Sequence, residues 1–149
     1  MPAKDLYHDL VVQLLIDEGW TITDDPLYLS YGGRDLFVDL GAERSAIAAQ
    51  KGNRKIAVEI KSFLKSSPVR DLGDAIGQYG IYQSILAELQ PERMLYLAVP
   101  KRAYETILTE KLGQLILRNW EIKLIVFDEV ERRIIQWIPQ KTIVNWFVI

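Results

Sequence analysis

The chain has 149 residues, a formal net charge of −2, no cysteine and a single histidine, His8. The lack of cysteine excludes a disulfide framework, a thiol nucleophile and a cysteine-based zinc site, and one histidine excludes a multi-histidine metal centre. Any bound metal must therefore have oxygen ligands, which favours Mg²⁺, Mn²⁺ or Ca²⁺. The length suits a single domain over residues 1–149, and the charge is not that of a protein that coats nucleic acid through its overall field.

The composition is typical of a globular protein, with 49% hydrophobic and 26% charged residues. No run of apolar residues is long enough to cross a membrane, and Met1–Asp5 does not resemble the start of a signal peptide. We therefore expect a cytoplasmic protein without a membrane partner.

In the first third of the chain the pattern predicts one helix followed by short strands. An apolar stripe that includes Tyr7, Val11 and Leu14 has helical spacing. Gly19 is typical of a helix end. The predicted elements are a helix at Lys4–Glu18, strands at Trp20–Thr23, Leu27–Tyr31 and Leu36–Leu40, and a short extended piece at Ala46–Gln50.

The remaining two thirds alternate strands with longer helices. Pro68 stands where the first turn of a helix tolerates proline, and Pro100 and Pro139 each end a strand. The predicted elements are strands at Lys55–Phe63, Met94–Val99, Glu121–Phe127 and Ile134–Ile138, and helices at Pro68–Leu89 and Tyr104–Asn119. This order predicts an α/β fold of the mixed α+β type, with helices packed on a central mixed sheet. The apolar tail at residues 139–149 is not assigned to an element.

Two of these strands carry acidic residues on the same expected face. In Lys55–Phe63, the apolar positions alternate with Glu59 and Lys61, which therefore share the face opposite the expected core. In Leu36–Leu40 the same alternation places Asp39 on the face away from the core. If the strands pair, Asp39 lies across from Glu59.

Two carboxylates that meet in this way make a site for a hard divalent cation. Such an ion would hold a water molecule and a phosphate oxygen, and Lys61 would orient the water or stabilise charge on the phosphate. The alternative is that Glu59 and Lys61 form a weak ion pair on a solvent-exposed face.

The predicted helices offer three further candidates. Gln78 and Tyr82 are four residues apart and share a helix face, where Tyr82 alone would suit core packing. Gly77 and Gly80 indicate close approach of a strand or a ligand, or simply packing.

Glu18 lies on the apolar stripe of the first helix, where it either reaches a metal or extends to solvent at the helix end. His8 is expected to be a surface or packing residue.

Several blocks of the sequence form a pattern typical of one known family. They are Val38–Glu43, Ile56–Phe63, Gly77–Tyr79 and Leu95–Pro100, together with Met1–Asp5, His8, Asp17–Thr23 and Asp25–Pro26 at the opening. Together these blocks resemble the XisH family, the fdxN element excision controlling factors of cyanobacteria. The resemblance covers the chain to about Trp137 and is most specific in the Ala-Val-Glu-Ile-Lys-Ser-Phe block at residues 57–63.

The resemblance implies a restriction-endonuclease-like fold of the PD-(D/E)XK type. In that pattern Asp39 takes the aspartate position, Glu59 the second acid and Lys61 the lysine, while Gln78 and Tyr82 resemble a Gln-x-x-x-Tyr element of some of these nucleases. Val38 stands where the superfamily name has proline. The resemblance also implies a role in programmed DNA excision during heterocyst development.

Two functions from different classes stay open. The first is a Mg²⁺- or Mn²⁺-dependent DNA nuclease, favoured by the complete acid–acid–lysine set. The second is a DNA- or protein-binding accessory subunit without turnover, favoured by the acidic net charge. The implied partners are DNA, a companion excision factor (XisI) and a site-specific recombinase, and a homodimer stays open.

Overall fold

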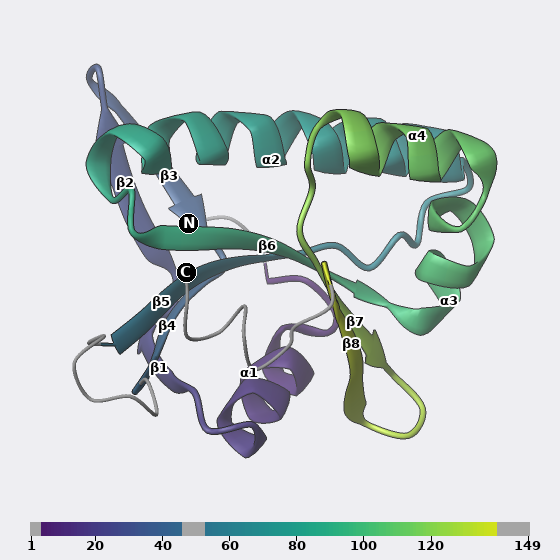
Figure 1. Cartoon of the computed structure of the whole chain (residues 1–149), viewed down its shortest axis with the longest axis horizontal. Coiled ribbons are helices and arrows are strands. Elements are labelled where there is room, and N and C mark those ends of the chain that lie inside the picture. Colours follow the sequence, from purple (N-terminus) through teal and green to yellow (C-terminus); the bar gives the residue numbers. More distant parts are fainter. Residues whose placement is uncertain (1–3, 46–52, 140–149) are drawn as a thin grey trace.

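The computed structural model describes residues 4–45 and 53–139. Its centre is a six-stranded mixed sheet in the order β1-β4-β5-β6-β7-β8 (Figure 1). The three central strands β5, β6 and β7 run parallel, and the outer strands pair antiparallel. The sheet strands are β1 (Thr21–Asp24), β4 (Leu40–Ser45), β5 (Asn53–Ile60), β6 (Arg93–Pro100), β7 (Leu124–Asp128) and β8 (Arg133–Ile138).

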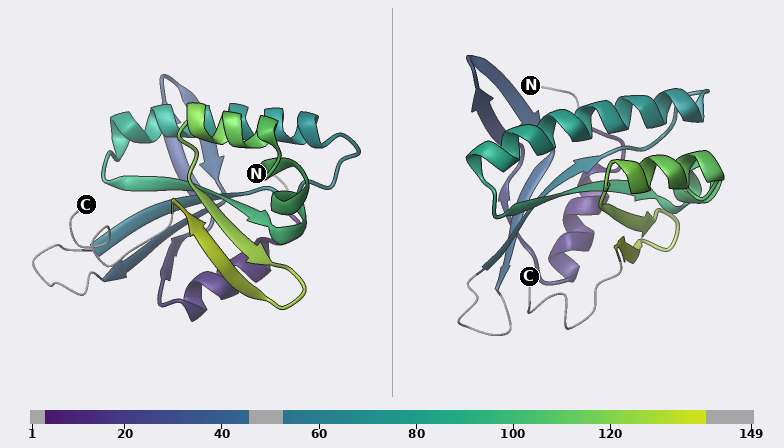
Figure 2. Two further views of the ribbon diagram at one scale, coloured as in Figure 1. Left: turned by 45° about the vertical axis from the view of Figure 1, so that its right-hand side comes forward. Right: turned by 45° about the horizontal axis from the view of Figure 1, so that its top comes forward.

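A separate two-stranded hairpin lies between β1 and β4 in the chain and projects beyond the sheet (Figure 2). It consists of β2 (Leu27–Tyr31) and β3 (Arg34–Val38). Gly32 and Gly33 form its two-residue turn with φ of 59° and 81°, which glycine adopts without strain.

Helices cover both faces of the sheet (Figure 1). One face packs against α1 (His8–Asp17), and the other against α2 (Pro68–Leu89), the short α3 (Lys101–Ala103), the π-helical turn η2 (Tyr104–Leu108) and α4 (Lys111–Asn119). The predicted mixed α/β architecture, a central sheet flanked by helices, is confirmed. Within the described residues, no helix is long and apolar enough to span a bilayer.

The two faces of β5 belong to two different hydrophobic cores. Ile56, Val58 and Ile60 pack with residues of α1 in one core, and Ala57 packs with residues of α2 in the other. The face of Glu59 was expected to lie away from the core, and that expectation is wrong because α2 covers it. A parallel central strand is normally buried on both faces, and here the polar residues at its end are buried with it.

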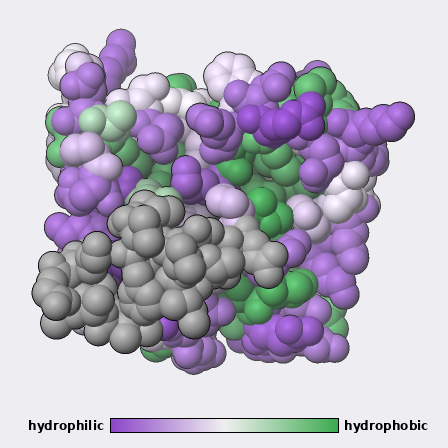
Figure 3. Space-filling view, viewed as in Figure 1, coloured by the Kyte–Doolittle hydropathy of each residue, from purple (hydrophilic) through white to green (hydrophobic). Residues whose placement is uncertain are grey.

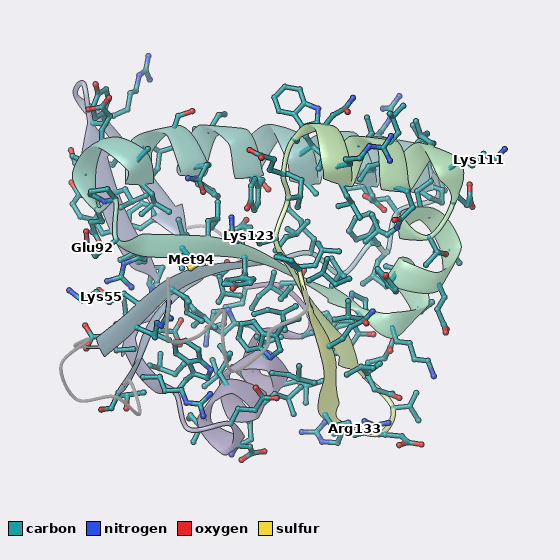
Figure 4. The ribbon with its side chains drawn as sticks, in the orientation of Figure 1. Lys55, Glu92, Met94, Lys111, Lys123 and Arg133 are labelled. Atoms are coloured by element: carbon teal, nitrogen blue, oxygen red, sulfur yellow. The ribbon has the colours of Figure 1, made fainter. Side chains whose placement is uncertain are left out.

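Tyr79 fixes α2 on the sheet. Its hydroxyl donates to the Leu95 carbonyl at 3.0 Å and accepts from the Lys123 backbone N–H at 3.2 Å. Lys123, just before β7, lies between α2 and the sheet (Figure 4).

An ion pair lies at the end of the sheet where β5 and β6 begin. Lys55 and Glu92 are side by side there (Figure 4), with Nζ and Oε1 4.0 Å apart.

Two predicted elements are divided in the structure. The strand expected at Leu36–Leu40 is broken at Asp39, because β3 belongs to the hairpin and β4 to the main sheet. The helix expected at Tyr104–Asn119 is broken between η2 and α4. There Gly113 packs so closely that a Cβ at this position would collide with the Ile107 carbonyl oxygen.

Smaller differences affect the element ends. The first helix begins at His8 instead of Lys4, β5 ends at Ile60 instead of Phe63, and β7 begins at Leu124 instead of Glu121. The extended piece expected at Ala46–Gln50 and the tail from residue 140 lie outside the described residues.

Candidate functional site

The structure places Asp39 and Glu59 together where the hairpin joins the main sheet. The register pairs Leu40 with Val58, so Asp39 lies opposite Glu59. The Asp39 backbone N–H donates to Glu59 Oε1 at 3.3 Å, and the Ile60 N–H donates to Asp39 Oδ2 at 2.8 Å. The two side chains also lie close enough to form a hydrogen bond when one of the carboxyl groups is protonated.

Burial makes this pair unusual electrostatically. The Glu59 side chain is only 5% exposed. Burial and then the negative charge of Asp39 raise the pKa of Glu59 to about 8. Burial likewise raises the pKa of Asp39, although the Ile60 hydrogen bond opposes this effect. At neutral pH the pair therefore holds a proton that an exposed pair would have lost.

Lys61 supplies a positive charge beside the pair. It directly follows β5, and its backbone N–H donates to the Ala98 carbonyl at 2.9 Å. Its charge lowers the pKa of Glu59, opposing the larger effects of burial and Asp39. Among the described residues, its half-buried ammonium makes no ion pair or hydrogen bond, so it remains available to a ligand.

The segment after Lys61 is held in place by two other parts of the chain. Arg102 of α3 donates to the carbonyl oxygens of Ser62 at 2.6 Å and Phe63 at 3.2 Å. Asp5 accepts from the Ser62 N–H at 3.1 Å. Phe63 has a φ of 55°, which is rare for a side chain of this size. These contacts therefore define where the chain turns away from Lys61.

Helix α2 brings Tyr82 and Gln78 to this side of the sheet. Burial, Glu59 and Asp39 together raise the pKa of Tyr82 to about 12, so its phenol is protonated at neutral pH. Gln78 lies one turn away on the same helix face. Its Oε1 is buried and has no hydrogen-bond partner among the described residues. A buried acceptor without a partner is costly and indicates a group that a ligand or water completes.

Glu18 does not belong to this arrangement. Its Oε1 accepts from Trp137 Nε1 at 3.2 Å, on the face of the sheet that α1 covers. Glu59 points to the opposite face, beneath α2. The sequence left Glu18 either as a metal ligand or as a residue that extends to solvent, and instead it meets the indole of Trp137 on β8.

Sequence reasoning missed two residues near Asp39. The negative charge of Asp5 raises the pKa of Asp39, and the charge of His8 lowers it. His8 is 4% exposed, and its Nε2 lies 2.7 Å from Asp25 Oδ1. Asp5 lies before α1 and His8 begins it, and no periodicity in the sequence indicates that this end faces the acidic pair.

The donor set fits a divalent cation. Two carboxylates are hard oxygen ligands, and a cation would remove the cost of their shared burial. Within residues 4–45 and 53–139, no three acidic or histidine side chains converge on one point, so the pair itself is the candidate metal centre.

Comparison with known proteins identifies the family. The family model described as XisH protein matches residues 1–135. A crystal structure of an XisH family protein from Nostoc punctiforme is 38% identical, with a TM-score of 0.80 over 89% of this chain and 98% of that chain. A fdxN element excision controlling factor protein from Anabaena variabilis is 40% identical, with a TM-score of 0.81 over 91% and 99%. No curated protein matches. The chain therefore belongs to the XisH family.

Proposed function

We propose that this protein is a controlling factor for excision of a DNA element and that Asp39, Glu59 and Lys61 form a metal-dependent endonuclease centre. The proposal includes a restriction-endonuclease-like fold and a cytoplasmic location. The observation that carries it is the buried pair of carboxyl groups beside a lysine whose ammonium is free of partners within the described chain. A site with only a structural role has no reason to keep these three groups together, because the burial of Glu59 costs stability.

Asp39 and Glu59 would hold the cation, which is Mg²⁺ or Mn²⁺ by the chemistry of their oxygen atoms. When bound, the ion supplies charge neutralisation for a phosphodiester and lowers the pKa of a bound water. Both carboxylates would have to be ionised to bind it, so the proton that the pair holds at neutral pH would have to be released.

The remaining residues act on the phosphodiester through their own donors. The Lys61 ammonium orients the attacking water or stabilises the charge that develops on the phosphate. Tyr82 offers a phenol that stays protonated, and Gln78 offers an amide whose oxygen has no described partner. These groups lie on α2, opposite the strand that carries Glu59.

The proposal includes partners that bring the DNA. The relative from Anabaena variabilis is named a fdxN element excision controlling factor protein. The net charge of −2 gives this chain little general attraction for a polyanion. We therefore include the companion factor XisI and a site-specific recombinase as the components that deliver the substrate.

Cleavage assays test the proposal. Supercoiled, linear and branched DNA are incubated with the protein and Mg²⁺ or Mn²⁺, with and without the companion factor. We expect metal-dependent cleavage that Glu59→Gln and Lys61→Met abolish and that Glu92→Gln, a change at an exposed carboxylate, leaves intact. Loss of cleavage in Glu92→Gln, or equal cleavage by all variants, rejects this site. DNA binding without cleavage under every condition supports the accessory subunit instead.

A further inference from the structure

An apolar groove runs along the outer side of the helical layer, away from the acidic pair. It lies between α2 and α4, which run side by side (Figure 2), and has a volume of about 680 Å³. Lys111 marks the start of α4 in Figure 4. In the space-filling view, hydrophobic residues are visible at the upper right of the molecule beside hydrophilic ones (Figure 3).

The floor of the groove is a stripe of glycines on α2. Gly73, Gly77 and Gly80 all line it, and their spacing places them on one helix face. A Cβ added at any of the three would meet no heavy atom of the described residues within 4 Å. Glycine inside a helix is destabilising relative to alanine. Packing within the described chain therefore gives no reason for these three glycines, whereas close approach of another segment does.

The walls of the groove leave large apolar side chains uncovered. Val69 and Ile81 of α2 are 56% and 53% exposed, and Leu112 and Trp120 on the α4 side are 42% and 60% exposed. Single exposed apolar residues are ordinary, but several that line one groove indicate a surface that is normally covered.

One segment of this chain has the composition to cover it. Of the seven residues 143–149, six are apolar, and this segment lies outside the described residues. The family match ends at residue 135, and the two related structures match over nearly their whole lengths while covering 89% and 91% of this chain. The apolar tail therefore lies outside the part of the chain that the family model matches.

The tail also starts close to the groove. Ile138 and Pro139 line a second cavity together with Glu121, and the neighbouring residue Trp120 lines the apolar groove. Each cavity thus has a lining residue at the end of α4, Trp120 for the apolar groove and Glu121 for the second cavity. The ten residues 140–149 span roughly 33 Å when extended, against a helix diameter of about 10 Å.

We propose that residues 140–149 dock into the groove between α2 and α4 of their own chain. The apolar side chains of the tail cover Trp120 and Ile81, and the glycine stripe lets its backbone approach α2. A tether this short gives the tail a high effective concentration at the groove, which favours the same chain over a second copy. The inference does not depend on nuclease activity.

Disulfide trapping tests it in the full-length protein, which has no cysteine of its own. Gly77→Cys on the groove floor is combined with Phe147→Cys in the tail. The matched control combines Phe147→Cys with Gln13→Cys, an exposed position of α1 on the opposite face of the sheet. We expect a disulfide within the monomer to form roughly tenfold faster in the first protein, because docking holds the two thiols together. Equal rates, or mainly disulfide-linked dimers, overturn the proposal.

Hydrogen exchange gives a second readout without a cross-link. The tail amides should be protected in the wild type. Gly77→Trp fills the groove and should abolish that protection, whereas Gln13→Trp should preserve it. Tail amides that exchange at the unfolded rate in the wild type, or protection that survives Gly77→Trp, overturn the docking.

Discussion

Replacing Glu59 with glutamine tests whether its carboxyl group is protonated in the folded protein. The glutamine amide imitates the protonated acid, since its oxygen still accepts from the Asp39 N–H and its nitrogen donates to the Asp39 carboxylate. The variant therefore keeps the local geometry and removes only the titration.

The sign of the pH effect follows from the raised pKa. Glu59 has a pKa of about 8 in the folded protein and an ordinary value of 4.5, so between these values the folded state binds more protons than the unfolded state. Stability is then highest at acidic pH and falls as the pH rises toward 8. Each pH unit within this range costs about 1.4 kcal/mol. Compared with strongly acidic pH, where Glu59 is protonated in both states, the folded protein loses less than about 1 kcal/mol of stability at pH 5. The loss reaches about 4 kcal/mol at pH 8.

Urea denaturation followed by circular dichroism, with EDTA present, measures this difference. The free energy of unfolding of the wild type should fall by about 3 kcal/mol more than that of Glu59→Gln between pH 5 and pH 8. Asp39→Asn should flatten the profile only in part, because the negative charge of Asp39 is gone while burial, the larger cause, still raises the pKa of Glu59. Glu92→Gln, at an exposed position, should follow the wild type.

The same experiment with metal tests the ion site. Mg²⁺ or Mn²⁺ would compete with the proton on Glu59, so its stabilising effect on the wild type should grow with pH, and both pair variants should lose it. Parallel pH profiles for wild type and Glu59→Gln would refute the buried-pair reasoning. A metal response that survives in both variants would place the ion elsewhere.

Three further variants test single residues. Lys61→Met should lower metal-dependent DNA cleavage at least about 100-fold, the scale of a lost electrostatic group, with an unchanged urea midpoint; unchanged cleavage would remove Lys61 from the site. Gln78→Met should raise the free energy of unfolding in urea by about 1 kcal/mol, because it removes a buried acceptor that has no hydrogen-bond partner among the described residues. The same variant should weaken DNA cleavage. A destabilised variant would show that the Gln78 oxygen does have a hydrogen-bond partner. Gly113→Ala should lower the melting temperature by an amount equivalent to about 2 kcal/mol or more, because its Cβ would collide with the Ile107 carbonyl; a wild-type melting curve would refute the close packing of α4 on η2.

The sequence alone determined the type and order of most elements. The alternation of apolar residues around Glu59 indicated a strand, and Pro68 correctly marked the start of α2. These features are local, because side-chain periodicity and proline geometry act within a few residues. The same alternation also put Asp39 and Glu59 on one side, and the observed register agrees with it.

Only the tertiary structure decided what surrounds that pair. Periodicity says which side chains share a face but not which element covers it, so the burial of Glu59 beneath α2 was not predictable. The same limit explains Glu18, which was expected to reach a metal or solvent but meets Trp137 of a strand more than a hundred residues later. Asp5 acts on Asp39 only because the chain before α1 returns to the end of β5. Such contacts depend on the path of the whole chain, and the pKa of Glu59 follows from that path.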